Sequence, residues 1–227
     1  MNTYRVQELG ADVVNEQIAL VRSRVMTADP GTYKKSVFMS AYFYAIFSAS
    51  GYAGVKRWTR AVDFRDVESV FFPLCLAHRN HWVLVHLSLP AATDGDSVQP
   101  IFTLYDSVHS TAFRTGEWRS MAESLKEWLK LEWRKYEIGP TKLAEPLIVV
   151  APNTEMPHQG PTLDCGLYVV RTIEALATGT PIDFASVDME YLRVLMAKEI
   201  VTQSLSRAVK GTSSRTADIT LAPRANS

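Results

Sequence analysis

The 227-residue sequence has no excess charge of either sign, few cysteines and no long apolar run. Its 24 basic and 24 acidic side chains balance, which argues against the basic surface typical of nucleic-acid binding. Two cysteines are too few for a disulfide-stapled secreted domain. The five histidines do not show zinc-finger spacing. We therefore expect free thiols, no metal, no cofactor and no nucleic-acid binding. We also expect no membrane binding, because no apolar run reaches about 18 residues.

The first residues, MNTYRVQELGADVV, also lack the basic stretch and apolar core of a signal peptide. The first periodic segment begins close to residue 1. This position suggests a domain trimmed from a longer protein.

Apolar side chains make up 47% of the sequence, enough for a folded core. Periodicity predicts helices and strands separated by polar turns. The expected helices span 12–26, 36–49, 116–135, 165–177 and 187–206, and the expected strands span 69–77, 81–89, 101–106 and 147–151. The pattern indicates an α+β fold, a mainly antiparallel sheet packed with helices, over residues 1–206. We expect the tail, 207–227, to be disordered.

Two of the expected strands contain residues that predict specific local structure. The strand at 69–77 contains Pro73, which should break it or confine it to an edge. It also contains Cys75, which we expect to be an inert core residue. The strand at 101–106 should form a hairpin with 81–89 across an exposed loop at 90–99.

Cys165 stands where the loop at 153–164 becomes a helix. Backbone amides and the positive end of the helix dipole stabilise a thiolate at such a position. The thiolate, and not the thiol, is the competent nucleophile. Gly166 follows, so no side chain crowds the sulfur on that side.

A nucleophilic thiol needs a base, and His81 is the candidate because it begins a buried strand. Asp106 ends the next strand, and the two strand ends of a hairpin can meet. A carboxylate there would fix the tautomer of the imidazole and stabilise its protonated form. Gln159, six residues before Cys165, could donate a hydrogen bond to the developing oxyanion.

Each of these residues also has an ordinary structural explanation. Cys165 could be a small core residue, and His81 a satisfied histidine at a strand end. Asp106 is a good turn former, and Gln159 an ordinary loop amide. Only the four together favour catalysis.

Five segments resemble the ubiquitin-like-protein proteases of the Ulp/SENP type, which process and remove SUMO. The first is GYAGVKRWTRAVD, residues 51–63; the second is His81 with Trp82; the third is Tyr105-Asp106-Ser107. The fourth is QGPTLDCGLYV, residues 159–169, which matches the Gln-x5-Cys-Gly signature, and the weaker fifth is 181–200.

The resemblance implies a papain-like cysteine protease architecture, with the nucleophile at the N-terminus of a buried helix. It implies that His81, Asp106 and Cys165 form a triad, that Gln159 contributes to the oxyanion hole, and that Trp82 is a wall of a tunnel admitting only a Gly-Gly tail. The implied activity is cleavage after the C-terminal Gly-Gly of SUMO, by a monomer without a cofactor. The implied location is the nucleus or cytoplasm, of a host cell if the protein is a secreted microbial effector.

Two departures from the family keep other functions open. Leu9-Gly10-Ala11-Asp12 stands where the family commonly has Trp-Leu-Asn-Asp, and the loop at 90–99 is longer than expected. The same chemistry on ubiquitin or NEDD8 is therefore an alternative. An acyltransferase on the same fold and a non-catalytic module that binds ubiquitin-like proteins are weaker ones.

Overall fold

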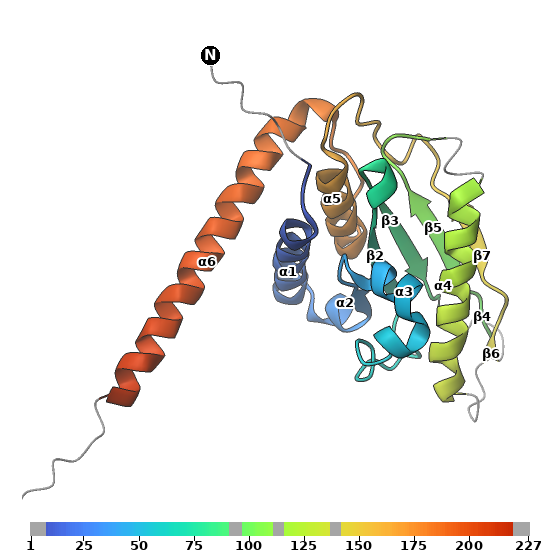
Figure 1. Cartoon of the computed structure of the whole chain (residues 1–227), viewed down its shortest axis with the longest axis horizontal. Coiled ribbons are helices and arrows are strands. Elements are labelled where there is room, and N and C mark those ends of the chain that lie inside the picture. The colour runs from blue at the N-terminus through green and yellow to red at the C-terminus, as the bar shows by residue number, and fades with distance from the viewer. Residues whose placement is uncertain (1–7, 91–96, 111–115, 137–141, 220–227) are drawn as a thin grey trace, which may run out of the picture. The chain divides into compact units, whose positions relative to one another are not determined.

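Figure 1 shows the chain as a computed structural model. The structure describes residues 8–90, 97–110, 116–136 and 142–219. Contacts divide the chain into two compact units, Met1–Val187 and Asp188–Ser227. Most of the loop expected at 90–99 lies outside the described residues.

A five-stranded mixed sheet forms the centre of the first unit, in the order β1-β2-β3-β5-β7. The central three strands are antiparallel, and the outer two join in parallel. The expected hairpin and the α+β class are confirmed, whereas the parallel outer strands were not expected. The strands are β1 (Ser36–Phe38), β2 (Ser69–Leu76), β3 (His81–Ser88), β5 (Ile101–Tyr105) and β7 (Leu147–Val150). A separate parallel pair consists of β4 (Ser97–Val98) and β6 (Lys142–Leu143).

Pro73 lies inside β2 without interrupting it. The pairing between β1 and β2 ends at Phe38 and Phe71, while β3 continues to pair with β2 beyond Pro73. At the proline, β2 therefore has a described neighbour strand on one side only. Because proline lacks an N–H, this free side is where a strand tolerates it. The expectation of an edge position is confirmed, and that of a break is wrong.

Helices cover both faces of the sheet (Figure 1). On one face, α5 packs against β3 and β2 and is itself contacted by α1 and α2. On the other face, α4 and α3 pack on the strands. The bounds are α1 (Ala11–Ala28), α2 (Pro30–Lys34), α3 (Phe43–Val55), α4 (Trp118–Trp133) and α5 (Cys165–Thr178), with short 3-10 turns η1 (Ala77–Arg79) and η3 (Arg134–Tyr136).

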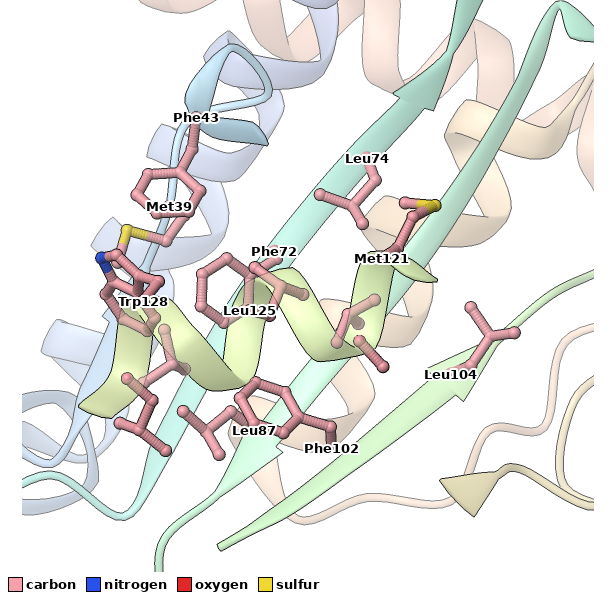
Figure 2. Close-up of a cluster of buried hydrophobic side chains, with 14 of the residues drawn as sticks. Met39, Phe43, Phe72, Leu74, Leu87, Phe102, Leu104, Met121, Leu125 and Trp128 are labelled. Carbon is pink, nitrogen blue, oxygen red and sulfur yellow. The ribbon is translucent and has the colours of Figure 1, made fainter. Parts of the chain in front are cut away.

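The main hydrophobic core lies between the sheet and α4, as Figure 2 shows. Met121, Leu125 and Trp128 follow one another at helical spacing along α4 and are at most 4% exposed. They meet alternate strand residues such as Phe72 and Phe102. The two periodicities, near 3.6 on the helix and 2 on the strands, put these side chains on facing surfaces. This core fixes the sheet whose strand ends carry the candidate site.

The helix predicted over 36–49 is wrong. Residues 36–38 form β1, and the helix begins only at Phe43. Within α3, only Phe43 and Val55 are buried. The run is apolar nearly all round, so its composition contains no period that would separate a short strand from a helix.

The second unit begins at Asp188, the last residue of the 3-10 turn η4 (Ser186–Asp188), and contains the long helix α6 (Met189–Ile219). Thus α6 continues into the tail for which disorder was expected; where the catalytic domain ends stays a prediction. Among the described helices, none combines the length and the hydropathy needed to cross a membrane.

Candidate active site

His81 begins β3 at the end of a tight turn from β2. The turn, η1, closes through Asn80, whose φ of 47° and ψ of 50° lie in the left-handed region. Asparagine is among the few residues besides glycine that adopt this conformation readily. Arg79 in the turn donates from Nε to Glu117, which precedes α4, at 2.8 Å. The short, anchored turn fixes where β3 starts and therefore where the His81 imidazole stands.

The imidazole of His81 meets the carboxylate of Asp106 at one end of the sheet. Asp106 directly follows β5, the antiparallel neighbour of β3, and is fully buried. Its Oδ1 lies 2.8 Å from Nε2 of His81. The carboxylate also accepts the backbone N–H groups of Val108, at 3.0 Å, and Ser110, at 2.9 Å. The structure thus brings together the two strand ends that the sequence analysis paired.

Cys165 is the first residue of α5, directly after the N-cap residue Asp164. The first N–H groups of a helix have no acceptor inside it, and the helix dipole adds partial positive charge there. Cys165 is 2% exposed, and its sulfur interacts electrostatically with His81. Because α5 packs on β3, the first residue of this helix lies near His81, the first residue of that strand.

These contacts shift the pKa values of His81 and Asp106 toward the charged forms. Burial lowers the pKa of His81, but the hydrogen bonds and charges of Asp106 and Cys165 outweigh it and raise the pKa to about 9. Burial raises the pKa of Asp106, but the His81 contact and two backbone N–H groups hold it below its usual range. At neutral pH the imidazole is therefore protonated, between the Asp106 carboxylate and the Cys165 sulfur.

Both ends of the Gln159 side-chain amide are held by hydrogen bonds. Its Oε1 accepts from Oγ of Ser107 at 2.6 Å, and its Nε2 donates to the backbone C=O of Thr162 at 2.8 Å. Its backbone N–H donates to the C=O of Ser107 at 3.0 Å. A primary amide has two N–H donors. Since Thr162 takes one, the other remains for a bound group.

A cavity of about 220 Å³ brings these side chains onto one surface. Its lining includes His81, Gln159 and Cys165, together with Glu8 and Leu163. Drug-sized ligands occupy sites of roughly 300–1,000 Å³. The smaller cavity suits a narrow group, such as the end of a peptide.

A larger cavity of about 630 Å³ lies elsewhere and contains none of the predicted site residues. Its lining includes Phe64, Leu89 and Trp133. Leu89 follows the end of β3 that is opposite to His81. The larger of these two cavities is therefore not the one that contains the reactive groups.

Trp82 is buried beside the start of α5. It is 3% exposed, and its Nε1 donates to the backbone C=O of Leu9 at 2.9 Å. A methyl group added to Gly166 would stand 3.1 Å from Cβ of Leu9 and 3.3 Å from Cδ1 of Trp82. Leu9, at the position where the family commonly has tryptophan, therefore packs with Trp82 and Gly166 next to Cys165.

Cys75 lies on β2 opposite Trp82 and is exposed, so the expectation of a core position is wrong. Its neighbours Leu74 and Leu76 are buried in the main core. Because strand side chains alternate between faces, Cys75 points to the other face. Although the Cys75 side chain reaches solvent, partial burial raises the pKa of its thiol, and the charge of Cys165 adds to this effect.

Several groups that shape the site carry little or no signal in the sequence. Ser107 carried a weak signal, because it follows Asp106 in the matched Tyr105-Asp106-Ser107 segment. Thr162 and the amides of Val108 and Ser110 act through main-chain atoms. Such atoms leave no residue-type signal in a sequence.

A buried helix that begins with a cysteine, beside a histidine and an aspartate at neighbouring strand ends, defines the class of papain-like cysteine peptidases. More specifically, the chain belongs to the Ulp1 protease family. Residues 7–208 match the family described as "Ulp1 protease family, C-terminal catalytic domain". The family expected from the sequence motifs is confirmed.

Curated relatives are similar over most of this chain. Sentrin-specific protease 2 of Rattus norvegicus is 28% identical over 74% of the chain, and sentrin-specific protease 5 of Homo sapiens is 27% identical over 84%. The chain spans 26% and 22% of those proteins, and 54% of an Arabidopsis thaliana relative.

Solved structures share the fold at lower identity. The Ulp1 protease domain in complex with Smt3, the yeast ortholog of SUMO, is 22% identical with a TM-score of 0.62, covering 87% of this chain and 78% of that one. The Xanthomonas campestris effector XopD bound to ubiquitin is 16% identical with a TM-score of 0.59, covering 86% and 93%.

Proposed function

We propose that this protein is a cysteine protease that cleaves after the C-terminal Gly-Gly of SUMO, removing SUMO from target lysines and maturing its precursor. The observation that carries the proposal is the His81 imidazole, which contacts the Asp106 carboxylate and interacts with the Cys165 sulfur at the head of α5. The names of the sentrin-specific relatives support SUMO as the substrate. Reduced thiols suit the nucleus or cytoplasm as its location.

The reaction follows from the charges of the three groups. The Cys165 thiolate attacks the carbonyl carbon of the last glycine and forms a C–S bond. The resulting oxyanion accepts hydrogen bonds from the remaining N–H of Gln159 and from the backbone N–H of Cys165. The latter is available because the first N–H groups of α5 have no acceptor inside the helix. His81 gives its proton to the leaving lysine amine as the C–N bond breaks. Water, deprotonated by His81, then hydrolyses the thioester and restores the thiolate.

The role of Asp106 is to hold the imidazole and stabilise its positive charge. Hydrogen bonds from His81, Val108 and Ser110 keep the carboxylate ionised and oriented. Trp82 is proposed as a wall of the slot that selects glycine. Its contact with Leu9 and Gly166 supports this role, since a tightly packed wall excludes side chains larger than a hydrogen atom.

Ubiquitin is the second candidate substrate. Leu9 replaces the tryptophan that the family commonly has, and leucine leaves more room beside Trp82. A fold relative, XopD, was crystallised bound to ubiquitin.

The deciding experiment compares three probes that carry a thiol-trapping group at the C-terminus of SUMO, ubiquitin or NEDD8. We expect SUMO to label Cys165 fastest, and the Cys165→Ala variant to remain unlabelled by all three. Labelling by ubiquitin alone would replace the SUMO assignment. Labelling of the Cys165→Ala variant would show that Cys165 is not the nucleophile.

A further inference from the structure

We propose that Ser107 is a positioning residue that orients the Gln159 amide toward the oxyanion. The inference rests on the proposed function and names a group that the catalytic sequence motif alone does not assign. Ser107 is 1% exposed and makes two contacts to the same residue, one through its hydroxyl and one through its backbone C=O.

The two ends of the amide are distinguishable because their partners differ. The C=O of Thr162 can only accept, so the end of Gln159 that faces it must be Nε2. The opposite end is then Oε1, which accepts from the Ser107 hydroxyl at 2.6 Å. Rotating the amide by half a turn would set Oε1 against the Thr162 oxygen. One N–H is consequently directed to Thr162, and the geometry of the planar amide fixes the other.

The hydroxyl of Ser107 stabilises this orientation of the Gln159 amide. Gln159 is 4% exposed, so its Oε1 has little access to water if Ser107 no longer donates. An amide held at Nε2 alone can swing about that bond. A donor that is displaced by about 1 Å loses much of its effect on a transition state. The oxyanion donor therefore depends on a side chain that touches no reacting atom.

Ser107 can be changed without disturbing the base. Its neighbour Asp106 is held by His81 and by the amides of Val108 and Ser110, none of which bonds to the Ser107 hydroxyl in the described structure. Removal of that hydroxyl should affect the oxyanion and spare the ion pair. If Ser107 only stabilised the fold of the 106–110 segment, its loss would displace Asp106 as well and would impair the ion pair with His81.

The test uses the full chain and two reactions of Cys165. The first is release of an aminocoumarin from the C-terminus of SUMO, which passes through an oxyanion. The second is alkylation by iodoacetamide, read on the Cys165 peptide by mass spectrometry, which requires the thiolate but forms no oxyanion. Variants are Ser107→Ala, Gln159→Ala and both together.

We expect Ser107→Ala to lower kcat about tenfold with KM within about twofold, and Gln159→Ala to lower kcat roughly 10²–10³-fold. The double variant should match Gln159→Ala alone, because Ser107 acts through Gln159. Alkylation rates and their pH dependence should stay at the wild-type level for Ser107→Ala. An unchanged kcat, additive losses, or a parallel loss of alkylation would each overturn the proposal.

A matched pair guards against misfolding. Ser107→Thr and Ser107→Val have the same shape and differ only in the hydroxyl, so any strain from the added methyl group is shared. We expect kcat of the Ser107→Thr variant to exceed that of the Ser107→Val variant by about tenfold. Equal kcat values would show that the hydroxyl has no role in orienting Gln159. A wild-type chain that releases aminocoumarin from neither SUMO, ubiquitin nor NEDD8 overturns the proposed function itself, and this inference with it.

Discussion

We propose that the proton on His81 sets the alkaline limit of the reaction. The pKa of about 9 lies above the ordinary value of 6.5, so the imidazolium is present below pH 9 and is lost as the pH rises through that value. We expect kcat for SUMO release to fall above about pH 9, because His81 can no longer protonate the leaving amine. Alkylation of Cys165 should not fall there, since it needs only the thiolate.

The same reasoning predicts the effect of Asp106→Asn on that limit. Without the carboxylate, one of the two groups that raise the pKa of His81 is lost, so this pKa would drop. The alkaline limb of kcat should move to lower pH, and kcat should fall by up to about 10⁴-fold, the loss known for an equivalent change in a serine triad. A limb that stays at pH 9 in the variant would contradict the assignment to His81.

Gly166 has little room for a side chain. A methyl group there would stand 3.1 Å from Leu9 and 3.3 Å from Trp82, tighter than ordinary contact. We predict that Gly166→Ala lowers kcat about ten- to a hundredfold, because the relief of this contact shifts Trp82 and the start of α5. Gly116→Ala is the control, since a methyl group there meets nothing within 4 Å. Equal kinetics for the two variants would show that the contact is irrelevant.

Among the elements, α4 is held to the segment after α3 by a buried polar contact. Thr59 Oγ1 donates to Oε1 of Glu132 at 2.7 Å, and the two residues are 1% and 0% exposed. We predict that Thr59→Val lowers the free energy of unfolding by about 1.5–3 kcal/mol, the range for a hydrogen bond to a charged group. The exposed Thr178→Val should change it by less than about 0.5 kcal/mol. Urea unfolding of both variants gives the comparison.

The edge strand β7 presents apolar side chains to solvent. Leu147 and Val149 are 49% and 41% exposed, and β5 is the only strand that pairs with β7 in the described structure. Because open apolar edges promote association, we predict that Val149→Lys reduces light scattering at high protein concentration without changing kcat. More scattering from the lysine variant would argue against this edge.

The elements also show where sequence reasoning works. Helical spacing of apolar residues on one face identified α1 and α4 nearly to their ends, whereas α5 was identified as a buried helix, and its first six residues are all buried. The run at 36–49 has no such face, and its division into β1 and α3 depends on tertiary pairing with β2. The parallel pairing of β7 with β5 is likewise a property of the whole sheet and not of its local residues.

Within the site, sequence reasoning found the groups whose type is informative. His81, Asp106, Gln159 and Cys165 are reactive or polar side chains in a characteristic order. The structure places His81, Gln159 and Cys165 in the lining of one cavity and Asp106 in contact with His81. The carbonyl of Thr162 and the amides that hold Asp106 belong to every residue type. Only coordinates can show which main-chain atoms are used.

For the whole molecule, the described groups of the site belong to the first unit, Met1–Val187. We predict that a chain ending at residue 206 unfolds cooperatively in urea and keeps kcat within about twofold. The full chain measured in parallel is the control. A large loss of kcat in the shortened chain would assign the rest of α6 a part in the working enzyme.

The hairpin of β3 and β5 has the candidate site at one of its two ends. Ser88 pairs with Ile101 where the hairpin closes, whereas His81 and Asp106 stand at its open end. Chain added between residues 90 and 97 is therefore attached a full strand length away from the imidazole. That connection offers a position for an epitope tag or a fluorophore that would leave His81, Asp106 and Cys165 unaltered.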